Sequence, residues 1–209
     1  MFPMRKVKRE VKIGTVAIGA NHPVAVQTML NVPVADVAGN VAQAKRVAAA
    51  GCQILRASVP TLEDVRLVEA IKSAVEIPFV ADIHFNYKIA LACVDAGADK
   101  IRLNPGNIGA DENVRAVARA CNAKNIPIRI GVNAGSLEKE ILARYGAPVP
   151  EALVESALYH VGLLEKHDFN NIVISIKSSN VPTMMAAYRL LSEKCDYPLH
   201  VGVTEAGTY

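Results

Sequence analysis

Tryptophan is absent from the 209-residue sequence, and aromatic residues make up only 5% of it. The four cysteines are scattered and form no Cys-x-x-Cys pair. That pattern is typical of buried, reduced thiols in a cytosolic protein, and it argues against a disulfide framework or a self-contained metal site.

No apolar run approaches the ~20 residues of a membrane-spanning helix. No apolar segment follows the basic N-terminus, as it would in a secretory signal. We therefore expect a cytoplasmic protein without a membrane partner.

A strong excess of charge of one sign is also missing, because the formal net charge is only +3. Much of the basic surplus lies within residues 5–12, which we interpret as a solvated tail. So small a surplus indicates neither a nucleic-acid partner nor a membrane surface. What the sequence has in quantity is hydrophobic residues, 51% of the total, dominated by small and β-branched types. This content is enough for one well-packed domain of helices on a buried sheet.

Short apolar strands alternate with amphipathic helices along the chain. After a short β-hairpin near residues 11–18, the pattern predicts strands at 24–29, 54–59, 78–83, 98–104, 127–133, 171–177 and 198–204. Helices are predicted over 36–50, 62–75, from the third strand to 96, and over 111–124, 136–145, 150–167 and 182–195. The even alternation predicts an α/β fold, a TIM-type (β/α)8 barrel rather than an open doubly wound sheet. Since such a barrel needs one further strand and helix, we expect the barrel to be truncated after the seventh strand.

Polar side chains stand near the carboxyl ends of these strands, where a purely structural strand would carry Val or Ile. In a TIM barrel, these ends line the mouth of the active site. Four of the side chains are cations, and converging cations favour an anionic ligand. Arginine forks bind phosphate oxygens in pairs, and glycine-rich turns at 105–109 and 133–136 could add backbone N–H donors. The strand-end residues are Gln27, Arg56, Ser58, Asp82, His84, Arg102, Asn104, Arg129, Asn133, Ser175, Lys177, Thr204 and Glu205.

Several interpretations of these residues compete. Asp82 and His84, at strand spacing, are an acid/base or hydrogen-bonding pair, and Glu205 is the strongest carboxylate candidate for proton transfer. Alternatively, Asp82 and Glu205 neutralise two of the four cations in buried ion pairs. Lys177 near the end of the sixth strand also fits a class I aldolase that forms a Schiff base. A non-catalytic phosphate-binding module is the remaining alternative.

Four longer motifs make the sequence recognisable. They are Val-Ala-Asp-Ile-His-Phe at 80–85, Ile-Arg-Leu-Asn-Pro-Gly-Asn-Ile-Gly at 101–109, Ile-Arg-Ile-Gly-Val-Asn-Ala-Gly-Ser-Leu-Glu-Lys at 128–139 and Gly-Val-Thr-Glu-Ala-Gly at 202–207. In this order they closely resemble the 4-hydroxy-3-methylbut-2-enyl diphosphate synthase family of the non-mevalonate isoprenoid pathway. The resemblance runs from about residue 11 to residue 208. It implies an iron–sulfur oxidoreductase that opens the ring of 2-C-methyl-D-erythritol 2,4-cyclodiphosphate and dehydrates it to 4-hydroxy-3-methylbut-2-enyl diphosphate.

The resemblance also assigns roles to individual residues. Catalytic roles fall to Glu205, Asp82 and His84, with Glu205 near the hydroxyl chemistry of the substrate. The substrate-binding positions that match the family are Arg56, Arg102, Asn104, Arg129, Asn133 and Lys177.

The cofactor implied by the resemblance is a 4Fe-4S cluster, held by three cysteines and a glutamate of a C-terminal domain. In the family's homodimer, that domain closes over the barrel mouth of the other subunit. None of the four cysteines here matches a cluster ligand, so we expect no metal ligand in this chain. Residues 1–209 are then an incomplete substrate-binding barrel, inactive alone, and the complete enzyme would take electrons from ferredoxin or flavodoxin.

Overall fold

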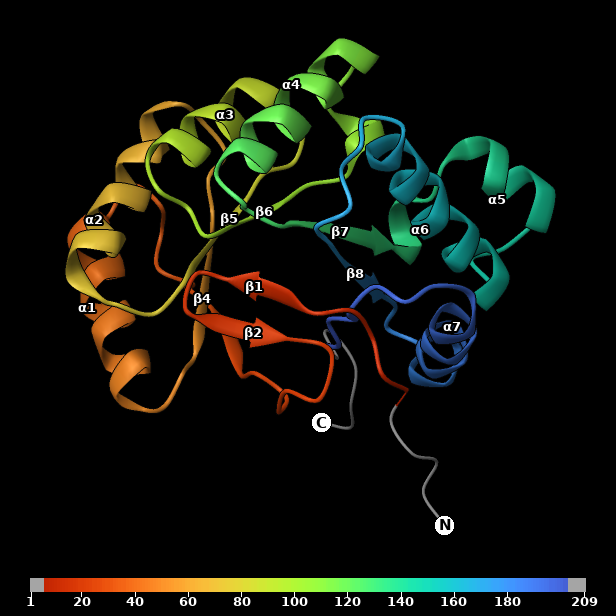
Figure 1. Ribbon diagram of the computed structural model, residues 1–209, viewed down its shortest axis with the longest axis horizontal. Helices are drawn as coiled ribbons and strands as arrows, with labels where there is room; N and C mark the ends of the chain where they lie inside the picture. The colour runs from red at the N-terminus through yellow and green to blue at the C-terminus, as the bar shows by residue number, and fades with distance from the viewer. Residues whose placement is uncertain (1–5, 203–209) are drawn as a thin grey trace.

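A parallel sheet, curled into the wall of a barrel, is the centre of the structure (Figure 1). The computed structural model describes residues 6–202 of the chain. Among these residues, six parallel strands lie side by side in chain order. The sheet contains β3 (Gln27–Met29), β4 (Ile54–Ser58), β5 (Phe79–Asp82), β6 (Lys100–Arg102), β7 (Ile128–Asn133) and β8 (Ile172–Lys177). This order, with a helix after each strand, confirms the prediction of an α/β barrel that is not closed.

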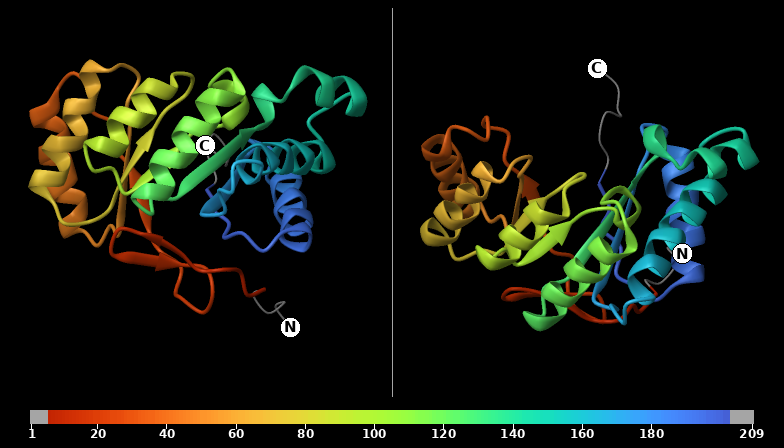
Figure 2. Two further views of the ribbon diagram at one scale, coloured as in Figure 1. Left: turned by 45° about the horizontal axis from the view of Figure 1, so that its top comes forward. Right: turned by 90° about the horizontal axis from the view of Figure 1, so that it is seen from above.

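The helices cover the outer face of the curled sheet, as Figures 1 and 2 show. Three of them begin where a side chain caps the first turn: Asp36 accepts from Gly39 N–H, Asn86 from Lys88 N–H, and Asn180 from Thr183 N–H. In the part of the chain that is described, no helix is long and apolar enough to cross a membrane. The α-helices are α1 (Val37–Ala49), α2 (Arg66–Ala74), α3 (Tyr87–Asp95), α4 (Asp111–Ala123), α5 (Lys139–Tyr145), α6 (Pro150–Glu165) and α7 (Val181–Lys194).

Most predicted bounds agree with the structure to within a few residues. The helix predicted from residue 62 begins with a 3-10 turn, η1 (Glu63–Val65), before α2, and two further elements differ for identifiable reasons. The helix expected from residue 136 starts later, at Lys139, because the Asn133 side chain accepts from Gly135 N–H and closes a short 3-10 turn, η3 (Ala134–Ser136). The last predicted strand, 198–204, is described only in part. There Leu199 forms a single parallel bridge with Ile174 of β8, and the residues from 203 onward lie outside the described chain.

The two faces of the sheet differ in chemistry because successive side chains on a strand point to opposite sides. Outward-facing residues such as Leu55, Ile101 and Ile130 are fully buried and belong to the main core with the helices. Positions one residue away carry polar groups instead, among them Lys100 and Arg129. The barrel wall is therefore apolar toward the helices and polar toward its interior.

A hairpin closes one end of this interior. Strands β1 (Val11–Ile13) and β2 (Val16–Ile18) pair antiparallel, as predicted, and lie across the sheet (Figure 1). Val11 and Ile13 form a separate apolar cluster with Ile54, Val80 and Val173, each at the start of its own strand. The amino-terminal end of the barrel is thus sealed with apolar side chains, which leaves the carboxyl ends of the strands as the polar mouth.

Candidate functional site

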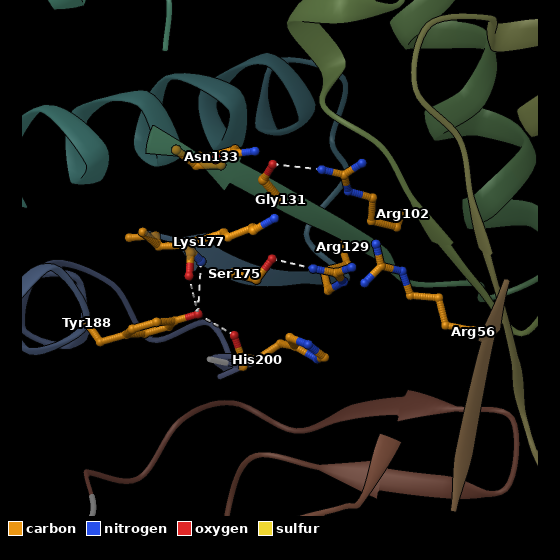
Figure 3. Close-up of a pocket in the computed structure, with 12 residues that line it drawn as sticks. Arg56, Arg102, Arg129, Gly131, Asn133, Ser175, Lys177, Tyr188 and His200 are labelled. Carbon is orange, nitrogen blue, oxygen red and sulfur yellow. Dashed lines mark hydrogen bonds between the residues drawn. The ribbon is translucent and has the colours of Figure 1, made fainter. Parts of the chain in front are cut away.

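Three arginines from three different strands point toward one another in a pocket at the polar mouth (Figure 3). Arg56 comes from β4, Arg102 from β6 and Arg129 from β7. The alternation of the strands turns all three inward, so the sheet itself brings these cations together. The full lining consists of Arg56, Arg102, Arg129, Gly131, Val132, Asn133, Ser175, Ile176, Lys177, Tyr188, His200 and Gly202.

Asp82 on β5 holds two of these arginines in place. Its Oδ1 accepts from Arg102 Nη1 at 3.0 Å, and its Oδ2 accepts from Arg56 Nε at 3.1 Å and also from Arg56 Nη2. The side chain is buried, which by itself would raise its pKa, but the Arg102 and Arg56 guanidinium groups hold the pKa of Asp82 below its usual value. Asp82 is consequently an ionised partner of the arginines, as the ion-pair interpretation expected of this carboxylate.

Arg129 makes the fewest hydrogen bonds of the three arginines among the described residues. Only 4% of it is exposed, and its Nη1 donates to the Ser175 hydroxyl. Its Nε and Nη2 are buried and have no hydrogen-bond partner among the described residues. Burial, together with Arg56 and Arg102, lowers the pKa of Arg129 to about 9, so the group stays charged at neutral pH. Because unpaired buried donors are costly, an acceptor placed in this pocket is strongly favoured.

The protein limits the positive charge around Arg129 by burying two further basic groups. Lys100 lies on the same face of β6 as Arg102, 1% exposed, with Nζ 3.2 Å from Gln27 Oε1. Burial, Arg129 and Arg56 drive the pKa of Lys100 well below its usual value. Burial and the same cations lower the pKa of His200 to about 3. The His200 imidazole is therefore neutral at pH 7, and burial among the arginines disfavours the charged form of Lys100.

Asn104 and His84 do not line the pocket. The Asn104 amide donates to Gly131 O at 2.9 Å and accepts from Gly131 N–H at 2.8 Å, so it joins β6 to β7. His84 is exposed, and its ring lies beside that of Phe85, with 6.1 Å between ring centroids. Thr204 and Glu205 lie outside the described residues.

The two glycine-rich turns use backbone donors within the protein. Gly106 lies in η2 (Pro105–Asn107) after β6, and its N–H donates to His160 Nδ1 at 3.2 Å. Gly135 N–H donates to Asn133 Oδ1 at 3.1 Å. Positive charge from side chains, rather than these two amides, is thus what the pocket offers to an anion.

Tyr188, which the sequence pattern did not single out, ties the pocket wall together. Its hydroxyl accepts from Ile176 N–H at 2.9 Å and lies 3.0 Å from Ile176 O, and it also hydrogen-bonds the carbonyl oxygen of His200 (Figure 3). It therefore fixes the backbone immediately before Lys177. The signal that could have found Tyr188 is a lone hydroxyl on an otherwise apolar helix face.

The described residues do not fit an iron–sulfur cluster. No group of three or more His, Cys, Asp or Glu side chains within residues 6–202 is arranged to hold a metal ion. Burial raises the pKa of the Cys93 and Cys121 thiols to about 12, which disfavours the thiolate form that binds iron.

Known proteins resemble this chain over its whole length. A family model described as the GcpE TIM-barrel domain matches residues 8–209. A relative from Caldanaerobacter subterraneus subsp. tengcongensis, named 4-hydroxy-3-methylbut-2-en-1-yl diphosphate synthase (flavodoxin), is 55% identical over 208 residues, which are 100% of this chain and 59% of the relative. A Fusobacterium nucleatum protein of the same name is 52% identical over 205 residues, 98% of this chain and 58% of that protein. The chain thus spans somewhat less than two thirds of the relatives it matches.

Solved structures share the fold at low sequence identity. The Yersinia pestis dihydropteroate synthase matches with a TM-score of 0.63 and 14% identity, over 91% of this chain and 74% of that one. Phospho-2-dehydro-3-deoxyheptonate aldolase from Thermotoga maritima matches with a TM-score of 0.66 and 12% identity, over 92% and 54%. These likenesses concern the barrel alone. The family model and the close relatives, by contrast, cover nearly every residue, and the chain belongs to the GcpE TIM-barrel domain family.

Proposed function

We propose that this chain is the substrate-binding barrel of a 4-hydroxy-3-methylbut-2-enyl diphosphate synthase. Its ligand is 2-C-methyl-D-erythritol 2,4-cyclodiphosphate, which the complete enzyme opens reductively and dehydrates to 4-hydroxy-3-methylbut-2-enyl diphosphate. The observation that carries the proposal is buried Arg129, which lines the pocket with Arg56 and Arg102 and has two nitrogens without a hydrogen-bond partner among the described residues. A cyclic diphosphate supplies several anionic oxygens on a compact ring, and arginine forks bind such oxygens in pairs.

Each candidate site residue named from the sequence has a role in this proposal. Arg56, Arg102 and Arg129 bind the two phosphoryl groups, while Lys177 and Asn133 contact them from the rim. Asp82 acts as an ionised carboxylate that sets the positions of Arg56 and Arg102. Asn104 supports the same wall through the β7 backbone. Glu205 and His84 are the proposed groups for proton transfer.

Reduction requires groups that the described residues do not provide. We propose that a 4Fe-4S cluster, carried by a further domain of the complete enzyme, supplies the electrons. The relatives' name includes flavodoxin, so flavodoxin is the proposed electron donor. The complete enzyme is proposed to be a cytoplasmic homodimer, and the barrel alone is proposed to bind substrate without reducing it.

Calorimetric titration of the 209-residue chain with the cyclodiphosphate tests the proposal. Arg129→Ala and Arg102→Ala are each expected to weaken binding by about tenfold or more, since a hydrogen bond to a charged group contributes about 1.5–3 kcal/mol. Arg115→Ala is the matched control, because Arg115 is exposed on α4, away from the pocket lining. Unchanged affinity in both pocket variants would exclude the diphosphate site.

A further inference from the structure

The pocket wall formed by β6 and β7 has little backbone pairing of its own. The two strands are in register at Ile101 with Ile128 and at Arg102 with Arg129, and Leu103 N–H donates to Arg129 O at 3.1 Å. Beyond that point, the side chains of Arg102 and Asn104 hold the β7 backbone at Gly131. On its other side, β7 pairs with β8 as far as Asn133 with Lys177. The two loops begin where this backbone pairing ends, so only contacts from outside the sheet can hold them beyond that point.

One histidine on α6 contacts both loops. His160 is 2% exposed, and its Nδ1 accepts from the N–H of Gly106 in the loop after β6, at 3.2 Å. Its Nε2 lies 2.8 Å from Oε1 of Glu138, at the end of the loop after β7. Gly106 also packs against the ring, because a Cβ built there would lie 2.8 Å from His160 Cε1. A single imidazole thus joins two loops that begin within a few residues of Arg102 and Asn133.

The two contacts require one particular form of the ring. An Nδ1 that accepts a hydrogen bond carries no proton, so the proton of the neutral ring is on Nε2, where it donates to Glu138. Burial lowers the pKa of His160, while Glu138 acts in the opposite direction. Phe, Met or Leu could fill the same volume, but none could accept from Gly106 and donate to Glu138 together.

We propose that His160 is a positioning residue for the anion pocket, and that it fixes the loops after β6 and β7 and through them Arg102 and Asn133. The identity of the ligand rests on the proposed function, whereas the anchoring of the loops does not. His160 is not among the residues that line the pocket, and it acts through these two loops.

Two conservative variants separate the two contacts. Asn places an amide near the position of Nδ1, so His160→Asn can still accept from Gly106. Gln places an amide near the position of Nε2, so His160→Gln can still donate to Glu138. Glu138→Ala removes the second contact from the loop side, at a residue whose side chain is 23% exposed and whose truncation leaves the core packed.

His167→Asn is the matched control. His167 Nε2 also lies against a carboxylate, at 3.0 Å from Oδ1 of Asp111, the first residue of α4. His167 follows the far end of α6, and this partner is neither Gly106 nor Glu138. His167 thus resembles His160 in pairing with a carboxylate and differs from it in its position relative to α6.

Hydrogen exchange of the ligand-free chain tests the anchoring. His160→Gln is expected to accelerate exchange at Gly106 by about tenfold or more, while His160→Asn preserves its protection. Glu138→Ala is expected to accelerate exchange in the segment 134–139. His167→Asn is expected to change exchange neither at Gly106 nor in the segment 134–139. Unchanged exchange in folded His160→Gln and Glu138→Ala would overturn the proposal.

Calorimetric titration with inorganic pyrophosphate tests the consequence for the pocket. His160→Gln and Glu138→Ala are each expected to weaken binding by about fivefold, the effect of one hydrogen bond, with melting temperatures that permit the comparison. If Arg129→Ala loses affinity while both of these variants keep that of the wild type, the positioning role is wrong. If the wild type itself binds neither pyrophosphate nor the cyclodiphosphate, the proposed function fails, and the exchange experiment alone decides whether His160 anchors the loops.

Discussion

At the scale of single residues, Asp82 shows how the pocket tolerates clustered positive charge. Its carboxylate is buried between Arg56 and Arg102, and the two guanidinium groups keep it ionised. Both arginines remain partly exposed, so each can still reach a ligand while one edge is held. The same carboxylate therefore supports both the fold and the direction in which the arginines point.

Asp82→Asn is expected to lower the free energy of unfolding at pH 7 by about 3 kcal/mol, because it leaves the arginines without their charged partner. The folded pKa of Asp82 lies below its unfolded value. Its contribution is therefore complete above the unfolded pKa of about 3.9 and is lost as the pH falls through the folded pKa. Urea unfolding at pH 7 and near pH 2 measures the difference, which should narrow at the lower pH.

The control for this change is Asp95→Asn, because Asp95 pairs with Lys124 on the surface with 78% of its side chain exposed. Such a surface pair contributes little to stability. Equal losses in the two variants would contradict the role given to Asp82.

Tyr188→Phe tests the hydrogen bonds by which the Tyr188 hydroxyl joins the backbone of Ile176, the residue before Lys177, to that of His200. The phenylalanine ring fills the same space but leaves the Ile176 N–H without its acceptor. The expected cost is about 1–3 kcal/mol of unfolding free energy, together with weaker pyrophosphate binding since the backbone before Lys177 is released. Urea unfolding and calorimetry measure the two effects. Tyr159→Phe, on exposed Tyr159 of α6, is the control, and a Tyr188→Phe chain that matched it would show that the hydroxyl bridge is dispensable.

At the scale of elements, most of the fold could be predicted, because the strands from β4 to β8 carry apolar residues such as Leu55, Phe79 and Ile130 on their outward face, and the helices have an apolar stripe. The pocket cations could be predicted for the same reason, since two-residue spacing places Arg129, Gly131 and Asn133 on one face. Lys100 was missed, because a lysine at the start of a strand is normally a surface residue. The partners of Asn104 and the exposure of His84 depend on neighbouring elements that no local pattern specifies.

The hairpin β1–β2 is the element whose role is easiest to isolate. Ile13 is fully buried in the cluster that seals the amino-terminal end of the barrel. Ile13→Ala is expected to cost about 3 kcal/mol of unfolding free energy and to leave the pyrophosphate dissociation constant unchanged, because the pocket is at the opposite end. Urea unfolding and calorimetry check both parts. Val24→Ala, at a side chain 82% exposed, is the control for stability, and a large loss of affinity in Ile13→Ala would show that the two ends are coupled.

At the scale of the whole molecule, ligand binding and stability are linked through the unpaired donors of Arg129. An anion that binds only the folded chain stabilises it by about 2.7 kcal/mol when present at about 100 times its dissociation constant. Pyrophosphate is therefore expected to raise the melting temperature of the wild type and to have a much smaller effect on Arg129→Ala. The rise should diminish as salt is added, since screening weakens charge attraction at the open mouth. A salt-independent rise of equal size in both proteins would point to binding elsewhere.

The two-sided sheet has a practical consequence for altering this barrel. Neighbouring positions along a strand have different roles: outward Leu55 and Ile130 pack against the helices, while inward Arg56 and Arg129 line the pocket. A library confined to the inward positions that line the pocket, with Asp82 kept unchanged, can therefore alter ligand recognition without rebuilding the scaffold. Randomising the outward positions changes the scaffold and leaves the ligand-facing chemistry as it is. Alternate residues of the same strands thus form the pocket and the contacts with the helices, so the pocket and the helix packing can be redesigned largely separately.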